Sequence, residues 1–119
     1  MEVVGKTIKE VIEKFLQEIN RAVEFEGNSE DFSTRFEIKG ISMQDVLEKF
    51  ANKIVNYFDK KRALFESIET EIIPGKKWVI KCSLKGKIFE RMVKDFKRIE
   101  VVALKEEYDG WKLLFSMKQ

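Results

Sequence analysis

Two segments of the chain repeat apolar residues at the spacing of an amphipathic helix. In each segment, Lys, Glu, Gln or Asn occupy much of the opposite face. Thr7 with Glu10, and Ser42 with Asp45, have the spacing of a capping box, which satisfies amide groups left open in the first helical turn. The pattern therefore predicts two helices. Their apolar stripes are Ile8, Val11, Ile12, Phe15, Leu16, Ile19 and Val23 in the first, and Val46, Leu47, Phe50, Ile54, Tyr57 and Phe58 in the second.

Six further segments have the alternation or the β-rich composition of strands. They are residues 2–4, 32–38, 64–73, 78–84, 99–107 and 111–117. Pro74-Gly75 suits the two central positions of a type II turn, and Asp109-Gly110 is a strong signal for a tight hairpin. We therefore expect two hairpins, one around each of these pairs.

The order strand, helix, strand, helix and four strands predicts an α+β domain. We expect two amphipathic helices packed on one face of a mixed, mostly antiparallel sheet of about six strands. Because no linker, repeat or low-complexity tract interrupts the pattern, residues 1–119 are expected to form a single domain.

The composition removes most catalytic chemistry. The 119 residues contain no histidine and a single cysteine, Cys82, which excludes imidazole bases, Cys/His nucleophile pairs and Cys/His zinc clusters. Cys82 shares the apolar face of its strand and is expected in the core, as are Trp78 and Trp111. We expect no cofactor, no metal and no enzyme. An enzyme that uses only carboxylates ranks last. It needs one carboxyl whose pKa is raised by burial, and no acid lies on an apolar stripe other than Asp59 and Glu66, which are near the ends of their elements.

The longest uncharged apolar stretches are a few residues, far short of the roughly 20 that cross a bilayer. The first five residues lack the layout of a signal peptide. We therefore expect a cytoplasmic protein with no membrane partner. Charged residues make up 37% of the chain, a composition that leans towards a thermophile.

Positive charge is concentrated between Lys76 and Arg98, where nine basic residues stand against Glu90 and Asp95. Strand alternation places Lys77, Lys81 and Lys85 on one exposed row, and residues 87–98 are expected to form a loop or a short helix. A lysine row either protects an edge strand from aggregation or binds a partner, and both readings stay open. The candidate partner-binding residues are Lys77, Lys81, Lys85, Lys87, Arg91, Lys94, Lys97 and Arg98.

An acidic cluster surrounds Gly27-Asn28-Ser29. It consists of Glu24, Glu26, Glu30 and Asp31. The cluster lacks the regular ligand spacing of a calcium-binding loop, so we expect a solvated connector there.

Three stretches resemble the archease family, small proteins that assist the tRNA-splicing RNA ligase. Residues 3–11 (VVGKTIKEV) are similar to the family's strand, glycine and helix opening. Residues 38–59, from Ile38-Lys39-Gly40 to Asn56-Tyr57-Phe58-Asp59, are similar to its second strand-helix unit. Residues 98–105 (RIEVVALK) and 109–116 (DGWKLLFS) are similar to its closing hairpin.

The same comparison shows where this chain departs from the family. Archeases hold metal-binding acids in an opening His-Thr-Ala-Asp motif and near the end of the last strand. Here Met1 follows the place of the first, and Ser116 stands where the second is expected. The family's Lys-Ala-Val-Thr-x-His stretch reads EVVALK at residues 100–105. The resemblance therefore implies a non-catalytic partner or regulator of an RNA ligase or related RNA-processing complex. The alternative is a small nucleic-acid-binding module that uses the basic 76–98 region.

Overall fold

The chain forms two helices and six strands in the order that the sequence predicts. The computed structural model describes residues 1–119. The elements are β1 (Glu2–Gly5), α1 (Ile8–Arg21), β2 (Val23–Gly40), α2 (Met43–Lys61), β3 (Ala63–Ile73), β4 (Trp78–Lys94), β5 (Arg98–Glu107) and β6 (Gly110–Lys118). The α+β class is thus confirmed.

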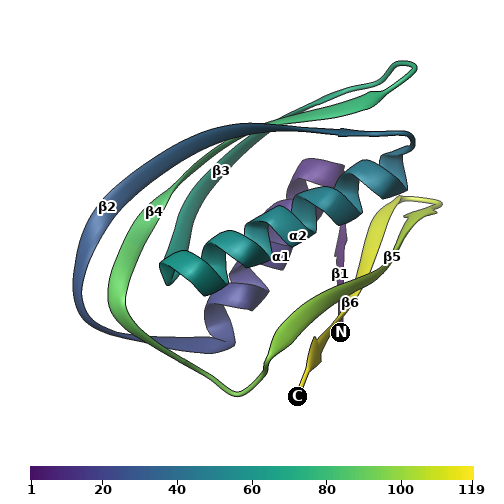
Figure 1. The fold of residues 1–119 in the computed structure, drawn as a ribbon. Coiled ribbons are helices and arrows are strands. Elements are labelled where there is room, and N and C mark those ends of the chain that lie inside the picture. Colours follow the sequence, from purple (N-terminus) through teal and green to yellow (C-terminus); the bar gives the residue numbers. More distant parts are fainter.

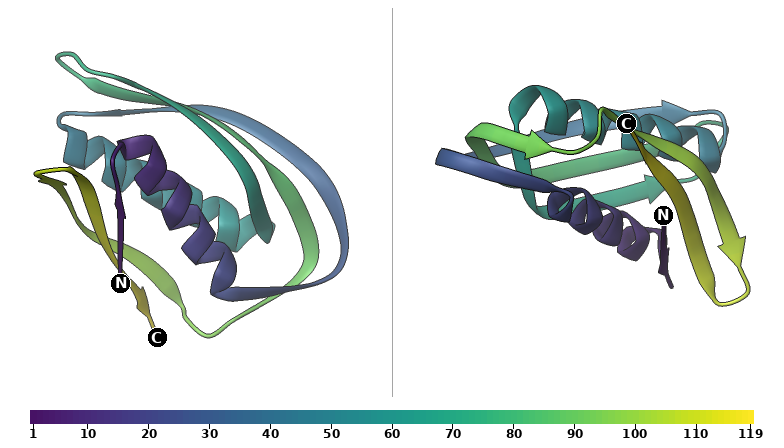
Figure 2. Two further views of the ribbon diagram at one scale, coloured as in Figure 1. Left: turned by 180° about the vertical axis from the view of Figure 1, so that it is seen from behind. Right: turned by 90° about the horizontal axis from the view of Figure 1, so that it is seen from below.

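The six strands form two sheets, where the sequence pattern predicts one. The first has the order β1-β6-β5 and the second the order β2-β4-β3, and every pairing is antiparallel. The second sheet bends around both helices, and the first lies across their other side (Figures 1 and 2). The helices therefore form a middle layer and do not cover one face of a single sheet. Alternation along a strand tells which side chains share a face, but it does not identify the neighbouring strand.

The middle position of the helices explains the breadth of their apolar stripes. Helix α1 buries five residues and α2 buries six. Phe15 of α1 packs edge-on against Phe115 of β6, with ring centroids 4.9 Å apart. The ring centroids of Phe50 of α2 and Phe36 of β2 are 5.9 Å apart. Each helix thus contributes aromatic packing to one of the sheets, and 22 buried residues form one continuous core.

Strands β2 and β4 are much longer than expected. They pair from Val23 with Lys94 to Gly40 with Trp78, and one bulge interrupts the register between Glu26 and Ser29. The predicted connector at residues 24–31 is therefore wrong, because these residues are the first part of β2. The predicted loop or helix at residues 87–98 is also largely wrong, since β4 continues to Lys94. Each long strand supplies the other's backbone partners, and no local signal shows this.

Both predicted hairpins are present, with turns that differ in detail. Pro74 to Lys77 connect β3 to β4, and the φ of Gly75 is not positive, so this is not a type II turn. Tyr108 and Asp109 connect β5 to β6, and Gly110 already pairs with Glu107. A β-carbon at Gly110 would lie 2.3 Å from the carbonyl oxygen of Gly5, which accounts for glycine at this contact.

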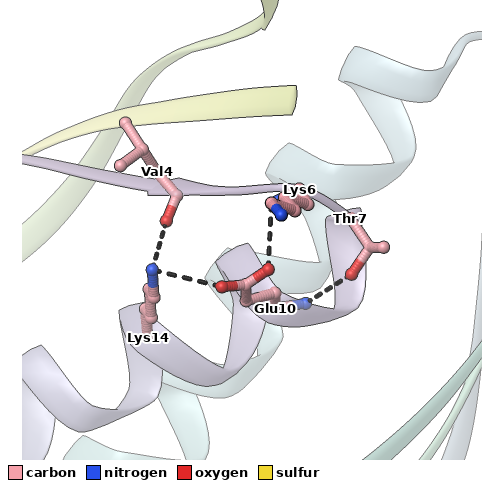
Figure 3. A network of polar contacts seen from close by, with 5 residues as sticks. All are labelled: Val4, Lys6, Thr7, Glu10 and Lys14. Atoms are coloured by element: carbon pink, nitrogen blue, oxygen red, sulfur yellow. Dashed lines mark hydrogen bonds and ion pairs between the residues drawn. The ribbon is translucent and has the colours of Figure 1, made fainter. Parts of the chain in front are cut away.

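A polar network ties the start of α1 to the end of β1 (Figure 3). The amide of Glu10 donates to Thr7 Oγ1 at 3.1 Å, as a capping box requires. The Glu10 carboxylate accepts from the amide of Lys6 at 2.9 Å, one residue before the N-cap. Lys14 Nζ pairs with the same carboxylate at 3.3 Å and donates to the carbonyl of Val4 at 2.7 Å.

The start of α2 repeats this network. The amide of Asp45 donates to Ser42 Oγ at 3.1 Å, and the Asp45 carboxylate accepts from the amide of Ile41 at 2.9 Å. Lys49 Nζ pairs with Asp45 at 3.1 Å and donates to the carbonyl of Lys39 at 3.4 Å. The two strand-helix units are thus built alike, although the sequence analysis identifies no repeat. Their counterparts, at a constant offset, are Gly5 and Gly40, Thr7 and Ser42, Glu10 and Asp45, Val11 and Val46, Glu13 and Glu48, Lys14 and Lys49, Phe15 and Phe50, and Ile19 and Ile54.

Candidate binding surface

The structure divides the eight predicted partner-binding residues into two groups, one from the turn before β4 to the middle of this strand and the other at or beyond its end. Lys81, Lys85 and Lys87 alternate on the face of β4 that points away from the helices, because Ile80, Cys82, Leu84 and Gly86 are buried on the other face. Lys77 is exposed in the turn before the strand. Arg91, Lys94, Lys97 and Arg98 lie at or beyond the far end of β4.

Strand β4 is the central strand of its sheet, and this position excludes one of the two interpretations of the lysine row. Its neighbours are β2 on one side and β3 on the other. A central strand has no free edge to protect, so protection of an edge strand is the wrong interpretation of these lysines. They must instead belong to the solvent-facing surface of the sheet.

That surface carries charges of both signs. Lys81 lies opposite Glu37 on β2 and Glu71 on β3, and Lys87 lies opposite Asp31. Lys85 lies between two serines, Ser33 and Ser67. Two shallow hollows of about 580 and 450 Å³ open along this face, and their walls include Arg35 and Glu69. The outer face is therefore polar and mixed in sign, and is not a continuous basic patch.

Most of the second group is neutralised by carboxylates. Lys94 pairs with Asp59 of α2, and its ammonium lies 5.0 Å from the centre of the Phe96 ring. Arg91 lies 3.5 Å from Glu26, and Arg98 lies 3.2 Å from Glu100. Lys97 is exposed in the short connection to β5. Two of these ion pairs join the end of β4 to β2 and α2, the third lies within β5, and the region offers little uncompensated charge.

The other singled-out side chains are packed as the sequence predicts. Cys82 is buried at 4% exposure, and this burial raises the pKa of its thiol to about 12. Trp78 and Trp111 are half-buried against the core. Of the two acids considered for carboxylate chemistry, Asp59 is paired with Lys94, and Glu66 is exposed on a groove between α1 and β3.

The two chain ends lie side by side at the outer part of the first sheet. The backbone nitrogen of Met1 donates to the carbonyl of Phe115, and the amide of Phe115 donates back to the carbonyl of Met1, each at 3.0 Å. Next to this pair, the hydroxyl of Ser116 is buried without a hydrogen-bond partner. Glu100 lies opposite Ser116 in the register and is bound by Arg98 and Lys118.

These groups do not fit a divalent cation. Calcium and magnesium require several oxygen ligands, mainly carboxylates, whereas Glu100, the carboxylate opposite Ser116 in the register, is occupied by two cationic side chains. Nowhere in residues 1–119 do three or more His, Cys, Asp or Glu side chains cluster in a way that could hold a metal ion.

Helix α2 carries a second basic surface that the sequence analysis misses. Lys53, Lys60 and Lys61 are exposed, and with Asn56 and Tyr57 they line a hollow of about 290 Å³. The available signal was the segment from Lys49 to Arg62, with five basic residues and only Asp59 as an acid. The apolar stripe of the same segment predicts the helix but not the charge of its exposed side.

No protein-family model matches this chain, and the comparison with curated proteins returns no match. Neither helix is long and apolar enough to cross a lipid bilayer.

Proposed function

We propose that this protein is a non-catalytic, archease-like partner of a tRNA-splicing RNA ligase or a related RNA-processing complex. The observation that carries the proposal is the pairing of the first strand with the last. The resemblance places the family's metal-binding acids before the opening strand and near the end of the closing one. Here these two places adjoin, since Met1 and Phe115 exchange two backbone hydrogen bonds.

The three stretches that resemble the family also come together in space. Strand β1, from the first stretch, pairs with β6 of the closing hairpin. Helix α2, from the second stretch, packs against β5 of the same hairpin. A resemblance spread over nearly the whole chain thus maps onto one connected part of the fold, which supports a common architecture.

A partner role fits the chemistry of the chain better than catalysis or activation through a metal. Ser116 stands where the resemblance expects an acid, and Glu100, which lies opposite Ser116 in the register, is already paired with Arg98 and Lys118. The outer face of β2-β4-β3, in contrast, presents charges of both signs around shallow hollows. Such a face suits a transient protein interface, where charge complementarity sets orientation and association rate.

The test is binding of the purified protein to the RNA ligase of the same organism, measured by calorimetry, by surface plasmon resonance for the association rate, and by a ligation assay. We expect a complex and no calcium-dependent stimulation of ligation. The double variant Lys81→Glu/Lys85→Glu should slow association about tenfold, because it reverses two charges of the outer face. The matched control is Lys9→Glu/Lys105→Glu, which reverses two exposed lysines elsewhere.

Three outcomes would count against the proposal. Absence of a complex would reject the ligase as the partner. Tight calcium binding by the isolated protein would show that a metal site survives. Equal effects of the two double variants would show that the outer face is not the interface.

A further inference from the structure

The exposed face of α2 has a charge that nothing else in the structure balances. Residues 53, 56, 57, 60 and 61 follow the helical spacing, so their side chains form one stripe about two turns long. Lys53, Asn56, Lys60 and Lys61 are exposed, and Tyr57 is half-buried. No ion pair involves Lys53, Lys60 or Lys61, whereas Lys14, Lys49 and Lys94 each pair with a carboxylate.

The stripe is also held in shape. The ammonium of Lys53 lies 5.4 Å above the ring of Phe36 on β2. The hydroxyl groups of Tyr57 and Thr34 are hydrogen-bonded at 3.1 Å, and the Tyr57 ring stacks on Phe32 with centroids 6.3 Å apart. Two of the five lining residues are thus fixed against the edge strand, which lowers the entropy cost of binding a ligand.

The repeated unit provides an internal comparison. On α1 the position that corresponds to Lys53 is Glu18, which pairs with Arg21 at 2.9 Å. Helix α1 carries acids and bases in equal number, while only Asp59 is acidic between Lys49 and Arg62. The positive face is therefore a property of the second strand-helix unit alone, and the fold of the unit does not require it.

The composition of this face fits a polyanion better than a protein. A face whose charge has one sign and that lacks an apolar anchor is typical of polyanion binding, whereas the outer face of β2-β4-β3 carries charges of both signs, as a transient protein interface does. The strongly exposed large apolar residues of this protein are Met1, Val4, Ile41, Val93, Val102 and Tyr108, and none lies on α2. Lysine and asparagine side chains, in contrast, are common donors to the phosphates of nucleic acids.

We propose that the exposed face of α2 binds the phosphodiester backbone of a single-stranded nucleic acid through Lys53, Lys60 and Lys61. The hollow in front of Asn56 admits a phosphate, and the ring of Tyr57 on its wall offers a surface to an unpaired base. This site lies on α2 and differs from the basic 76–98 region, where Lys81 is flanked by Glu37 and Glu71. It does not depend on the ligase partnership.

The experiment is fluorescence anisotropy with a labelled single-stranded RNA and with DNA of the same sequence, over a range of salt concentrations. The test variant is Lys53→Gln/Lys60→Gln/Lys61→Gln. The matched control is Lys81→Gln/Lys85→Gln/Lys87→Gln, which removes the same charge from the outer face of the sheet. All six lysines point into solvent or lie on the outer face, so circular dichroism should show both variants folded.

We expect the α2 variant to bind at least about tenfold more weakly at low salt and to reduce the slope of log affinity against log salt by about 2, since each lost phosphate contact contributes about 0.7 for a single strand. The control variant should bind like the wild type. Tighter binding of the RNA than of the DNA would show that the face prefers RNA, and equal binding would show that it accepts either single strand; both results support the proposal.

The proposal is overturned if the wild-type protein does not bind either strand at low salt, or if the control variant loses as much affinity as the α2 variant. Poly-glutamate provides the last arm. If it displaces the strand as well as unlabelled RNA does at equal charge, the face binds acidic proteins and not nucleic acid. Each of these results is independent of whether the protein binds a ligase.

Discussion

At the residue scale, burial alone determines the chemistry of Cys82. Its side chain lies between Ile80 and Leu84 on the inner face of β4, among core residues. No charged group accompanies it, so the raised pKa of about 12 results from loss of water around the thiolate. The thiol therefore acts as a small apolar group, in agreement with its place in the strand pattern.

We predict that Cys82 reacts very slowly with dithionitrobenzoate in the native protein. Relative to an ordinary thiol with a pKa of 9.0, a pKa of about 12 lowers the thiolate fraction about a thousandfold at mildly alkaline pH. The same thiol should react within the mixing time in concentrated guanidinium. Rapid reaction of the native protein would show that this part of β4 opens readily.

Asn20 shows what a sequence pattern does not reveal at this scale. Its side-chain amide donates to the carbonyl of Phe65 at 2.7 Å, and its carbonyl accepts from the amide of Phe65 at 3.3 Å. It thereby replaces a neighbouring strand beside the irregular register of β3 between Phe65 and Ser67. Nothing local marks Asn20 for this role, because its partner lies far along the chain. Cys82 was predictable because its environment follows from strand alternation.

At the scale of elements, the two helix starts are the best-defined local structures. In both, a carboxylate accepts a hydrogen bond from the backbone amide before the N-cap and also pairs with a lysine. The amide of Lys6, followed by Lys14, lowers the pKa of Glu10, and the amide of Ile41, followed by Lys49, lowers the pKa of Asp45. Both carboxylates therefore stabilise the fold in their charged form.

We predict that Glu10→Gln/Asp45→Asn destabilises the protein at neutral pH and that the difference from wild type shrinks in acid. A lowered pKa gives stability that is present above the ordinary values of 4.5 and 3.8 and is lost as the pH falls through the lowered ones. Urea unfolding at neutral pH and below pH 3.8 measures this. Glu13→Gln is the control, since Glu13 has no part in the network. An unchanged difference in acid would show that the carboxylate charges do not contribute.

The elements also mark where prediction from the sequence stops. Helix periodicity, capping residues and turn residues act locally, so the helices, their N-caps and the two hairpins could be predicted. The length of β2 and β4, and the central position of β4, depend on pairing between distant segments. For this reason the lysine row was placed on the correct face, but its acidic neighbours Glu37 and Glu71 were not foreseen.

At the scale of the whole molecule, the helices connect the two sheets. Helix α1 contacts β1 and β6 of one sheet and β3 of the other, and α2 contacts β5 as well as β2 and β4. The division into two sheets could not be predicted, because the apolar stripes show how much surface a helix buries but not how many sheets supply it. We expect both sheets to unfold together.

The two tryptophans allow this to be measured, since Trp78 reports on the β2-β4-β3 sheet and Trp111 on the β1-β6-β5 sheet. Unfolding of Trp78→Phe and Trp111→Phe, each followed by the remaining fluorescence and by far-ultraviolet circular dichroism, should give coincident transitions. Phe115→Ala, which removes the ring packed on Phe15, should lower stability by about 3–5 kcal/mol for both probes. Separate transitions would instead show two independently folding layers.

The pairing of β1 with β6 has a consequence for how the protein folds during its synthesis. Strand β1 has its only hydrogen-bonded neighbour in β6, so Val3 has no sheet to join until synthesis has passed β6. Contacts between segments so far apart in the sequence form slowly, and the backbone edge of β1 stays unpaired meanwhile.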